Sequence, residues 1–238
     1  LDLAGVPLFS KDRTELAPLV CVGGPCACNP EPIADFCDLV FLGDGEESTN
    51  QVLDLLKECK HAGKSKQYFL SKAKDIRGVY VPSFYVDSYN NDGTLKELKP
   101  INGAPEKVKK AVVSDMNSVY YPKSFVVPFI EIVHDRAVEE IFRGCIRGCR
   151  FCQAGFIYRP IREKSVETIN EQAKALIKST GYDEVSLCSL STSDHSRVNE
   201  MLTSLIDWTV KEKINLSLPR QVHSVCAMLS TKMLPKKR

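Results

Sequence analysis

Short apolar segments alternate with amphipathic ones in two parts of this chain, and this alternation limits its fold more than any other feature. In the first part, residues 18–22 and 38–42 predict buried strands that end in glycine turns, and residues 46–60 predict a helix. The expected core stripe of this helix consists of Val52, Leu53, Leu55 and Leu56. Apolar strands separated by helices are typical of a parallel sheet covered on both faces, so the sequence predicts an α/β fold.

The same alternation returns after residue 129. Apolar segments predict three strands and two helices in the order β-α-β-α-β, at residues 138–142, 166–178, 184–188, 198–210 and 214–218. Right-handed crossovers are expected between such strands. This second part therefore predicts the beginning of a parallel (β/α) partial barrel.

The region between the two parts has a different pattern. Residues 80–89 have strand composition, the Asn90–Asn91–Asp92–Gly93 sequence favours a turn, and residues 94–98 can pair back as a hairpin. Residues 100–128 are polar and contain four prolines, which predicts an extended connector. We expect the resulting domains to span residues 1–62, 63–128 and 129–219, followed by an atypical tail at 220–238.

Composition excludes several classes of protein. Of the 238 residues, 43% are hydrophobic and 26% charged, which is typical of a globular chain rather than a fibrous or disordered one. The apolar runs are too short to span a bilayer, so we expect no membrane partner and a cytoplasmic location. The chain begins at Leu1 without an initiator methionine or a leader, and we expect it to be a fragment of a longer protein.

Three of the ten cysteines are crowded together and are candidate metal ligands. Cys145, Cys149 and Cys152 have C-x3-C-x2-C spacing, and three soft thiolates at this spacing favour zinc or an iron-sulfur cluster. A structural zinc needs a fourth ligand, for which His134 and His195 are the candidates. A cluster held by three cysteines would leave one iron open. We expect three further cysteines to be buried like small hydrophobic residues: Cys21, Cys37 and Cys188.

The cysteine motif resembles the signature of the radical S-adenosylmethionine (SAM) superfamily, with Phe151 at the aromatic position before the third cysteine. The longer stretch 131–163 resembles the uncharacterised members that carry an N-terminal cobalamin-binding-like domain. In those proteins the upstream doubly wound sheet has a Gly-Gly-Pro strand end and a Gly-x-Gly-Glu turn, here residues 23–25 and 43–46. The resemblance implies a 4Fe-4S cluster on Cys145, Cys149 and Cys152, with SAM on the open iron.

The resemblance also implies roles for other residues. The usual Gly-Gly-Glu that meets the SAM amino group is replaced here by residues 189–194, and Ser189 and Ser191 are the candidates for that role. Phe151 and Tyr158 are further candidates for the SAM pocket. No Asp-x-His-x-x-Gly sequence is present, so no histidine for cobalt can be named, although cobalamin remains a possible cofactor. No residue is assigned to catalysis.

A basic stretch surrounds the cysteines. Residues 143–164 contain six cations and a single acid, Glu163; the cations are Arg143, Arg147, Arg150, Arg159, Arg162 and Lys164. Such a patch could hold the SAM carboxylate, dock an acidic electron donor such as a flavodoxin or ferredoxin, or bind the phosphates of an RNA substrate. It could equally be a solvated rim with a few ion pairs.

From the resemblance, the chain is expected to be a radical SAM enzyme of unknown reaction. The alternative is a non-catalytic zinc-binding or iron-sulfur electron-transfer module.

Overall fold

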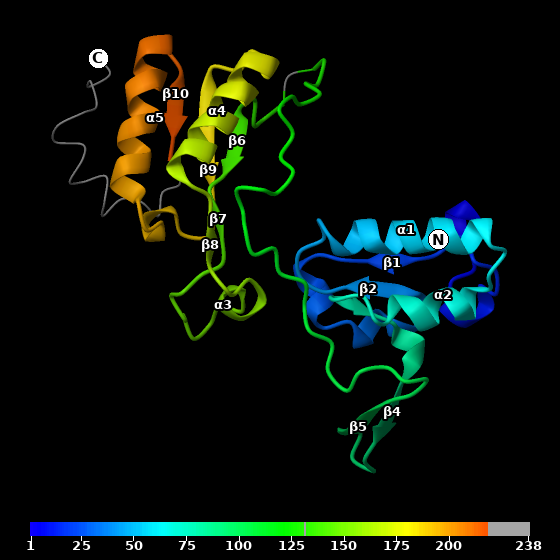
Figure 1. Ribbon diagram of the computed structural model, residues 1–238. Helices are drawn as coiled ribbons and strands as arrows, with labels where there is room; N and C mark the ends of the chain where they lie inside the picture. The colour runs from blue at the N-terminus through cyan, green and yellow to red at the C-terminus, as the bar shows by residue number, and fades with distance from the viewer. Residues whose placement is uncertain (131, 219–238) are drawn as a thin grey trace. The chain divides into compact units, whose positions relative to one another are not determined.

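The computed structural model describes residues 1–130 and 132–218, so the predicted tail at 220–238 lies outside the described residues. The chain forms two compact units, residues 1–113 and a second unit that begins at Ser114 (Figure 1). No helix among the described residues has the length and apolar character that crossing a membrane requires.

The first unit contains a three-stranded sheet in the order β1-β2-β3. Strands β1 (Cys21–Val22) and β2 (Leu39–Phe41) are parallel, as the sequence predicts. Strand β3 (Val79–Tyr80) joins antiparallel to β2, so the sheet continues beyond residue 62. The predicted domain limits remain a prediction, but the unit around this sheet extends to Val113.

Both faces of this sheet are covered. Helices α1 (Ser48–His61) and α2 (Lys66–Ala73) share one apolar cluster with Leu39. The opposite face packs Val40 against the segment that carries the short helices η3 (Pro25–Cys28) and η4 (Glu31–Phe36). The other short 3-10 helices of the unit are η1 (Asp2–Ala4), η2 (Ser10–Asp12) and η5 (Pro82–Phe84).

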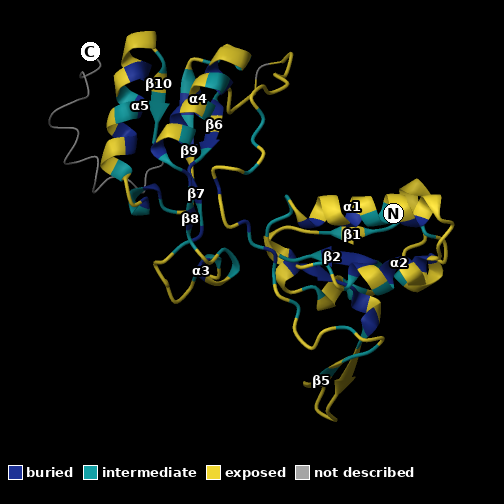
Figure 2. Cartoon of the chain, viewed as in Figure 1, coloured by how far each residue is buried: buried dark blue, intermediate teal, exposed yellow. Residues whose placement is uncertain are grey.

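One residue that was predicted to lie in the core, Leu53, lies on the outward face of α1. Val52 is buried and Leu55 and Leu56 pack against the core, but Leu53 is 55% exposed. One residue turns a helix by about 100°, so Leu53 follows Val52 around to the solvent side, where Lys57 lies one turn further on. Figure 2 shows most of α1 as exposed.

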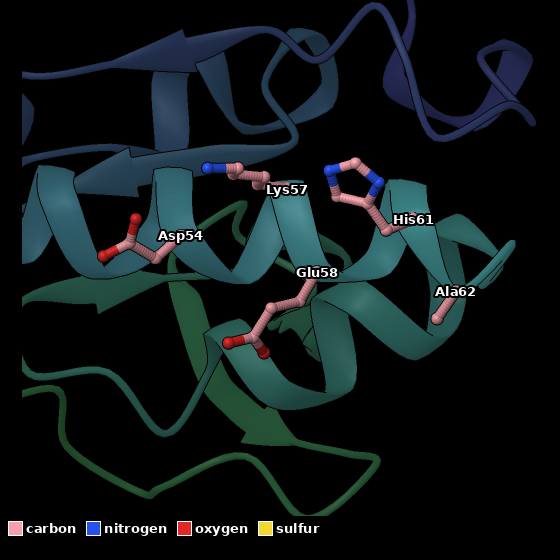
Figure 3. A pocket seen from close by; sticks show the side chains of 5 residues that line it. All are labelled: Asp54, Lys57, Glu58, His61 and Ala62. Atoms are coloured by element: carbon pink, nitrogen blue, oxygen red, sulfur yellow. The ribbon is translucent and has the colours of Figure 1, made fainter.

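A shallow hollow lies along α1, and Figure 3 shows the side chains that line it. Two acids and two bases alternate there at helical spacing, from Asp54, Lys57, Glu58 and His61, with Ala62 at the end. Mixed charges at i, i+3 and i+4 are typical of a solvated helix face. We assign no ligand to this hollow.

The predicted hairpin is present. Strands β4 (Tyr85–Tyr89) and β5 (Leu95–Pro100) are antiparallel, and the Gly93 N–H donates to the Asn90 carbonyl at 3.0 Å across the turn. Gly93 has a φ of +82°, which glycine adopts without strain.

Part of the predicted connector packs against the first sheet. The Ala111 N–H donates to the Leu42 carbonyl at 2.8 Å, and Gly43 forms a bridge to Ala111. A side chain at position 43 would lie 2.1 Å from the Ala111 carbonyl oxygen, so this approach requires glycine. Residues 109–113 therefore flank the carboxyl end of β2 rather than forming a free linker.

The second unit contains a parallel sheet in the order β10-β9-β6. Its strands are β6 (Ala137–Glu140), β9 (Glu184–Cys188) and β10 (Asn215–Ser217). Helices α4 (Val166–Thr180) and α5 (Val198–Glu212) connect them, which confirms the predicted β-α-β-α-β order. The ends of α4 follow the sequence: the Ser165 hydroxyl accepts from the Thr168 N–H, and Gly181 ends the helix at a φ of +75°.

Within the described residues, α4 and α5 pack on the same face of this sheet. Ala137, Val185 and Leu187 point into the cluster with both helices, whereas Val138 and Cys188 on the other face are exposed. Cys188 and Cys21 are thus not buried as predicted, because Cys188 lies on this open face and Cys21 on the outermost strand β1. Cys37 is buried, as predicted.

Candidate metal centre

The three candidate cysteines lie in a loop that leaves the carboxyl end of β6. A two-stranded antiparallel pair, β7 (Phe142–Arg143) and β8 (Arg162–Glu163), closes the base of this loop. We call residues 144–161 the cysteine loop. It contains one helical turn, α3 (Ala154–Ile157). The carboxyl edge of a parallel β/α sheet is where catalytic loops gather in barrel enzymes, so this position suits a reaction centre.

Two glycines shape the cysteine loop. Gly144 has a φ of +103°, and a Cβ there would lie 2.7 Å from the Pro160 carbonyl oxygen. The two sides of the loop base therefore approach more closely than any side chain allows. Gly148 has a φ of +60° between the first two cysteines. Both positions confirm that backbone freedom is required here.

All three thiols are free and accessible. Cys145 and Cys152 are half-buried, Cys149 is exposed, and the Cys152 N–H donates to the Cys149 carbonyl at 3.0 Å. Among the described residues, no three His, Cys, Asp or Glu side chains lie close enough to hold one metal ion. In a four-iron cluster each thiolate binds its own iron, whereas zinc ligands share a single ion. Three soft thiols on one short loop are donors of the kind that an iron-sulfur cluster accepts.

His195 has no ring nitrogen available for a zinc ion. His195 is 3% exposed, and its Nδ1 accepts from the Arg197 N–H at 3.1 Å. Nε2 must then carry the proton, which it donates to the Lys164 carbonyl at 3.1 Å, so neither ring nitrogen can bind a metal. The Nδ1 of His134 lies 3.2 Å from the Arg136 guanidinium.

Most of the basic residues around the cysteines already have partners. Arg143 pairs with Glu140, Arg147 with Asp194, and Lys164 with buried Glu139. Arg162 is buried and Arg159 stacks on Phe156, leaving Arg150 exposed and without an ion-pair partner in the part of the chain that the structure describes. Five of the six cations thus make structural contacts rather than forming a single free patch.

Arg147 has a particular place among them, because it lies between the first two cysteines. Its pKa is raised first by its hydrogen bond with Asp194, then by the charge of Asp194, with smaller contributions from Cys145 and Cys149.

Models of one superfamily match both units of the chain. Residues 1–82 match the N-terminal model of radical SAM proteins, and residues 140–217 match the radical SAM superfamily model. The chain belongs to the radical SAM superfamily. Membership implies a 4Fe-4S cluster and SAM as cofactors, in agreement with the donor set of the cysteine loop.

Relatives of known sequence or structure agree with this assignment. The chain is 29% identical over 189 residues to the uncharacterized protein MJ0966 of Methanocaldococcus jannaschii, covering 79% of this chain and 35% of that protein. Its fold is similar to that of TsrM, a radical SAM methyltransferase from Kitasatospora setae solved with tryptophan and a SAM analogue (TM-score 0.54, 12% identity, 83% of this chain and 36% of TsrM). A second TsrM structure, with cobalamin and a 4Fe-4S cluster bound, gives a TM-score of 0.51 at 12% identity over 84% of this chain and 37% of TsrM. The chain thus spans about a third of the length of these relatives.

The radical SAM residues predicted to meet SAM lie in two loops. Phe151 is 92% exposed in the cysteine loop, and Tyr158 is half-buried at the end of α3. Ser189 and Ser191 follow β9, where the Ser189 and Thr192 hydroxyls are 2.9 Å apart. These four assignments remain predictions.

The structure also reveals functional candidates that the sequence reasoning missed. Residues 194–196 begin at the last residue of the short helix η6 (Thr192–Asp194) and contact the cysteine loop or its base at three consecutive positions. Their partners are 31 to 47 positions away in sequence, so no local spacing signals the contacts.

Proposed function

We propose that this chain forms the cluster-binding part of a radical SAM enzyme, with Cys145, Cys149 and Cys152 holding a 4Fe-4S cluster that leaves one iron for SAM. The observation that carries the proposal is the C-x3-C-x2-C loop at the carboxyl edge of a parallel β/α sheet in a member of this superfamily. When bound, the cluster supplies the electron that cleaves SAM to methionine and a 5'-deoxyadenosyl radical.

The residues of this chain would provide binding and orientation. The three thiols offer ligands from a loop whose base is fixed by β7 and β8 and by the close approach at Gly144. The loop after β9 would hold the amino acid end of SAM through Ser189 and Ser191.

A cobalamin-dependent reaction is a second element of the proposal. Residues 1–82 match the N-terminal model of radical SAM proteins, and the fold of the chain is similar to that of TsrM, one structure of which holds cobalamin. We propose the carboxyl edge of β1 and β2 as the binding face, because ligands of open α/β sheets bind there. Cobalamin added to the full chain should co-elute with it and change its visible spectrum on binding.

The substrate and partners are proposed more broadly. An electron donor of the flavodoxin or ferredoxin type would reduce the cluster, and a phosphate-bearing substrate such as RNA would use the remaining exposed cations, Arg150 and Arg159. Because most other cations of the loop are paired, we expect binding of RNA to depend strongly on Arg150. A zinc-binding or electron-transfer module is the less favoured alternative, since His195 is fully engaged.

Anaerobic reconstitution tests the proposal. The full chain with iron and sulfide should become brown, and SAM with dithionite should release 5'-deoxyadenosine. Cys149→Ala should lose the visible absorbance, whereas Cys28→Ala, which removes another exposed thiol in the first unit, should retain it. A colourless protein that contains zinc, or a Cys149→Ala spectrum like that of the unaltered chain, would contradict the assignment.

A further inference from the structure

Three consecutive residues of the β9–α5 loop contact the cysteine loop or its base. Asp194 accepts two hydrogen bonds from Arg147, the one from Nε being 2.7 Å long. His195 Nε2 donates to the Lys164 carbonyl at 3.1 Å. Ser196 donates through its N–H to Glu163 Oε1 at 2.8 Å and through its hydroxyl to Oε2. We call residues 194–196 the clasp.

Two of the three clasp residues, Asp194 and His195, have side chains that are largely shielded from solvent, whereas Ser196 is exposed. The Asp194 side chain is 9% exposed although its partner Arg147 is 56% exposed, and His195 is 3% exposed. Burial alone would raise the pKa of Asp194, but hydrogen bonds from Arg147 and Ser191 lower it below its usual value. The carboxylate is therefore charged at neutral pH, and two parallel N–H···O bonds fix its direction.

The clasp is continuous with the residues predicted to hold SAM. The Asp194 N–H donates to the Ser191 carbonyl at 2.9 Å, and the His195 N–H to the Thr192 carbonyl at 3.3 Å. Thr192 is fully buried and its hydroxyl meets that of Ser189. A displacement of the cysteine loop would thus be transmitted to residues 189–192 through a short chain of hydrogen bonds.

We propose that Asp194, His195 and Ser196 are positioning residues that hold the SAM-binding loop at a fixed place relative to the cysteine loop, with Arg147 as their counterpart inside the cysteine motif. This inference rests on the proposed function, since it concerns how two loops of that site are aligned. Misalignment of about 1 Å can cost 100-fold in rate, so a fixed connection between the two loops has a direct catalytic use.

Hydrogen exchange tests the connection without any cofactor. In the full chain, Arg147→Gln should raise the exchange rates of the amides in residues 189–196 by roughly fivefold or more, because local opening becomes easier. The matched control is Arg197→Gln, which removes another Arg–carboxylate pair with two hydrogen bonds, to Glu200, at the adjoining start of α5. Control rates in residues 189–196 should stay within about twofold of those of the unaltered chain. Equal exchange in the two variants would overturn the inference.

SAM affinity tests whether the clasp contributes to SAM binding. After anaerobic reconstitution, Arg147→Gln and Asp194→Asn should keep the iron and sulfide content of the unaltered chain, because all three cysteines remain. Equilibrium dialysis should show SAM binding weakened about tenfold in both and unchanged in Arg197→Gln. Unchanged SAM affinity per cluster would overturn the positioning role even if exchange is faster. If the unaltered chain binds no iron or no SAM, the proposed function fails and the SAM role fails with it, whereas equal exchange rates overturn this inference alone.

Discussion

Among the described residues, each unit has one fully buried carboxylate, and the two carboxylates have different sets of hydrogen-bond donors. In the first unit, Asp38 accepts hydrogen bonds from Arg13 and Ser10 and from the Val20 N–H, and Lys66 lies 2.6 Å away. In the second unit, Glu139 pairs with Lys164 at 2.9 Å, but its Oε2 has no hydrogen-bond partner among the described residues.

The pKa values follow this difference in donors. Burial would raise the pKa of Asp38, but hydrogen bonds from Lys66, Ser10 and Val20 lower it below its usual value. Burial also raises the pKa of Glu139, and the single cation Lys164 does not compensate, so that the pKa reaches about 7. The comparison teaches that the number of donors around a buried acid, more than its burial, decides whether it stays charged.

The largest effect is expected at Asp38. Asp38→Ala leaves Arg13 and Lys66 buried without their carboxylate, which should lower the free energy of unfolding by about 3–5 kcal/mol. Hydrogen exchange at Leu39 and Val40 in β2 would measure the loss in the first unit. A loss below about 1 kcal/mol would show that the two cations find other partners and would remove the basis of the comparison.

Lys164→Met should cost less. The substitution leaves Glu139 buried without a cation, but this acid can take up a proton, so we expect a loss of about 1–3 kcal/mol at neutral pH. Trp208, the single tryptophan of the chain, is buried in this unit and reports its unfolding by fluorescence. The loss should shrink toward pH 5; a loss that stays constant with pH would mean that Glu139 does not titrate.

Ser10→Ala removes one of several donors to Asp38. We expect a loss of about 1 kcal/mol, because the remaining donors still satisfy the carboxylate. The pKa of Asp38, followed by NMR, should rise toward its ordinary value. No movement of this pKa would contradict the role given to the number of donors.

Glu139→Gln should have the smallest effect at neutral pH, within about 1 kcal/mol, because the amide oxygen can still accept from Lys164. Its effect is on the pH dependence. The folded chain holds a proton on Glu139 between about pH 4.5 and 7 that the unfolded chain releases, so this group's contribution to stability falls as pH rises through that window. The variant should lose this slope in Trp208-monitored unfolding, and an unchanged slope would assign it to another group.

The sequence predicted the elements with strong periodicity and missed contacts that depend on distant residues. Strand β9 has the predicted bounds, Glu184–Cys188, because alternating apolar residues lie between clear turns. Strand β3 was wrongly merged into a longer strand from residue 80, since Pro82 begins a 3-10 turn that interrupts it.

In the candidate site, too, local features could be predicted from the sequence, whereas contacts between distant residues could not. The cysteine spacing and the glycines that shape the loop are local and could be recognised from sequence. The pairing of Arg147 with Asp194 joins residues 47 positions apart, so the sequence alone left open whether the basic stretch is a patch or a rim with ion pairs. Leu53 could not be placed from sequence, because a dense apolar run does not show which of its residues faces solvent.

The close approach at Gly144 has a consequence for genetic variation. At the base of the cysteine loop, the backbone of residue 144 lies so near to Pro160 and Ile161 that even an alanine methyl group would collide with them. In a saturation mutagenesis library selected for the activity of this protein, position 144 should therefore be as depleted as the three cysteines, although it donates nothing to a metal.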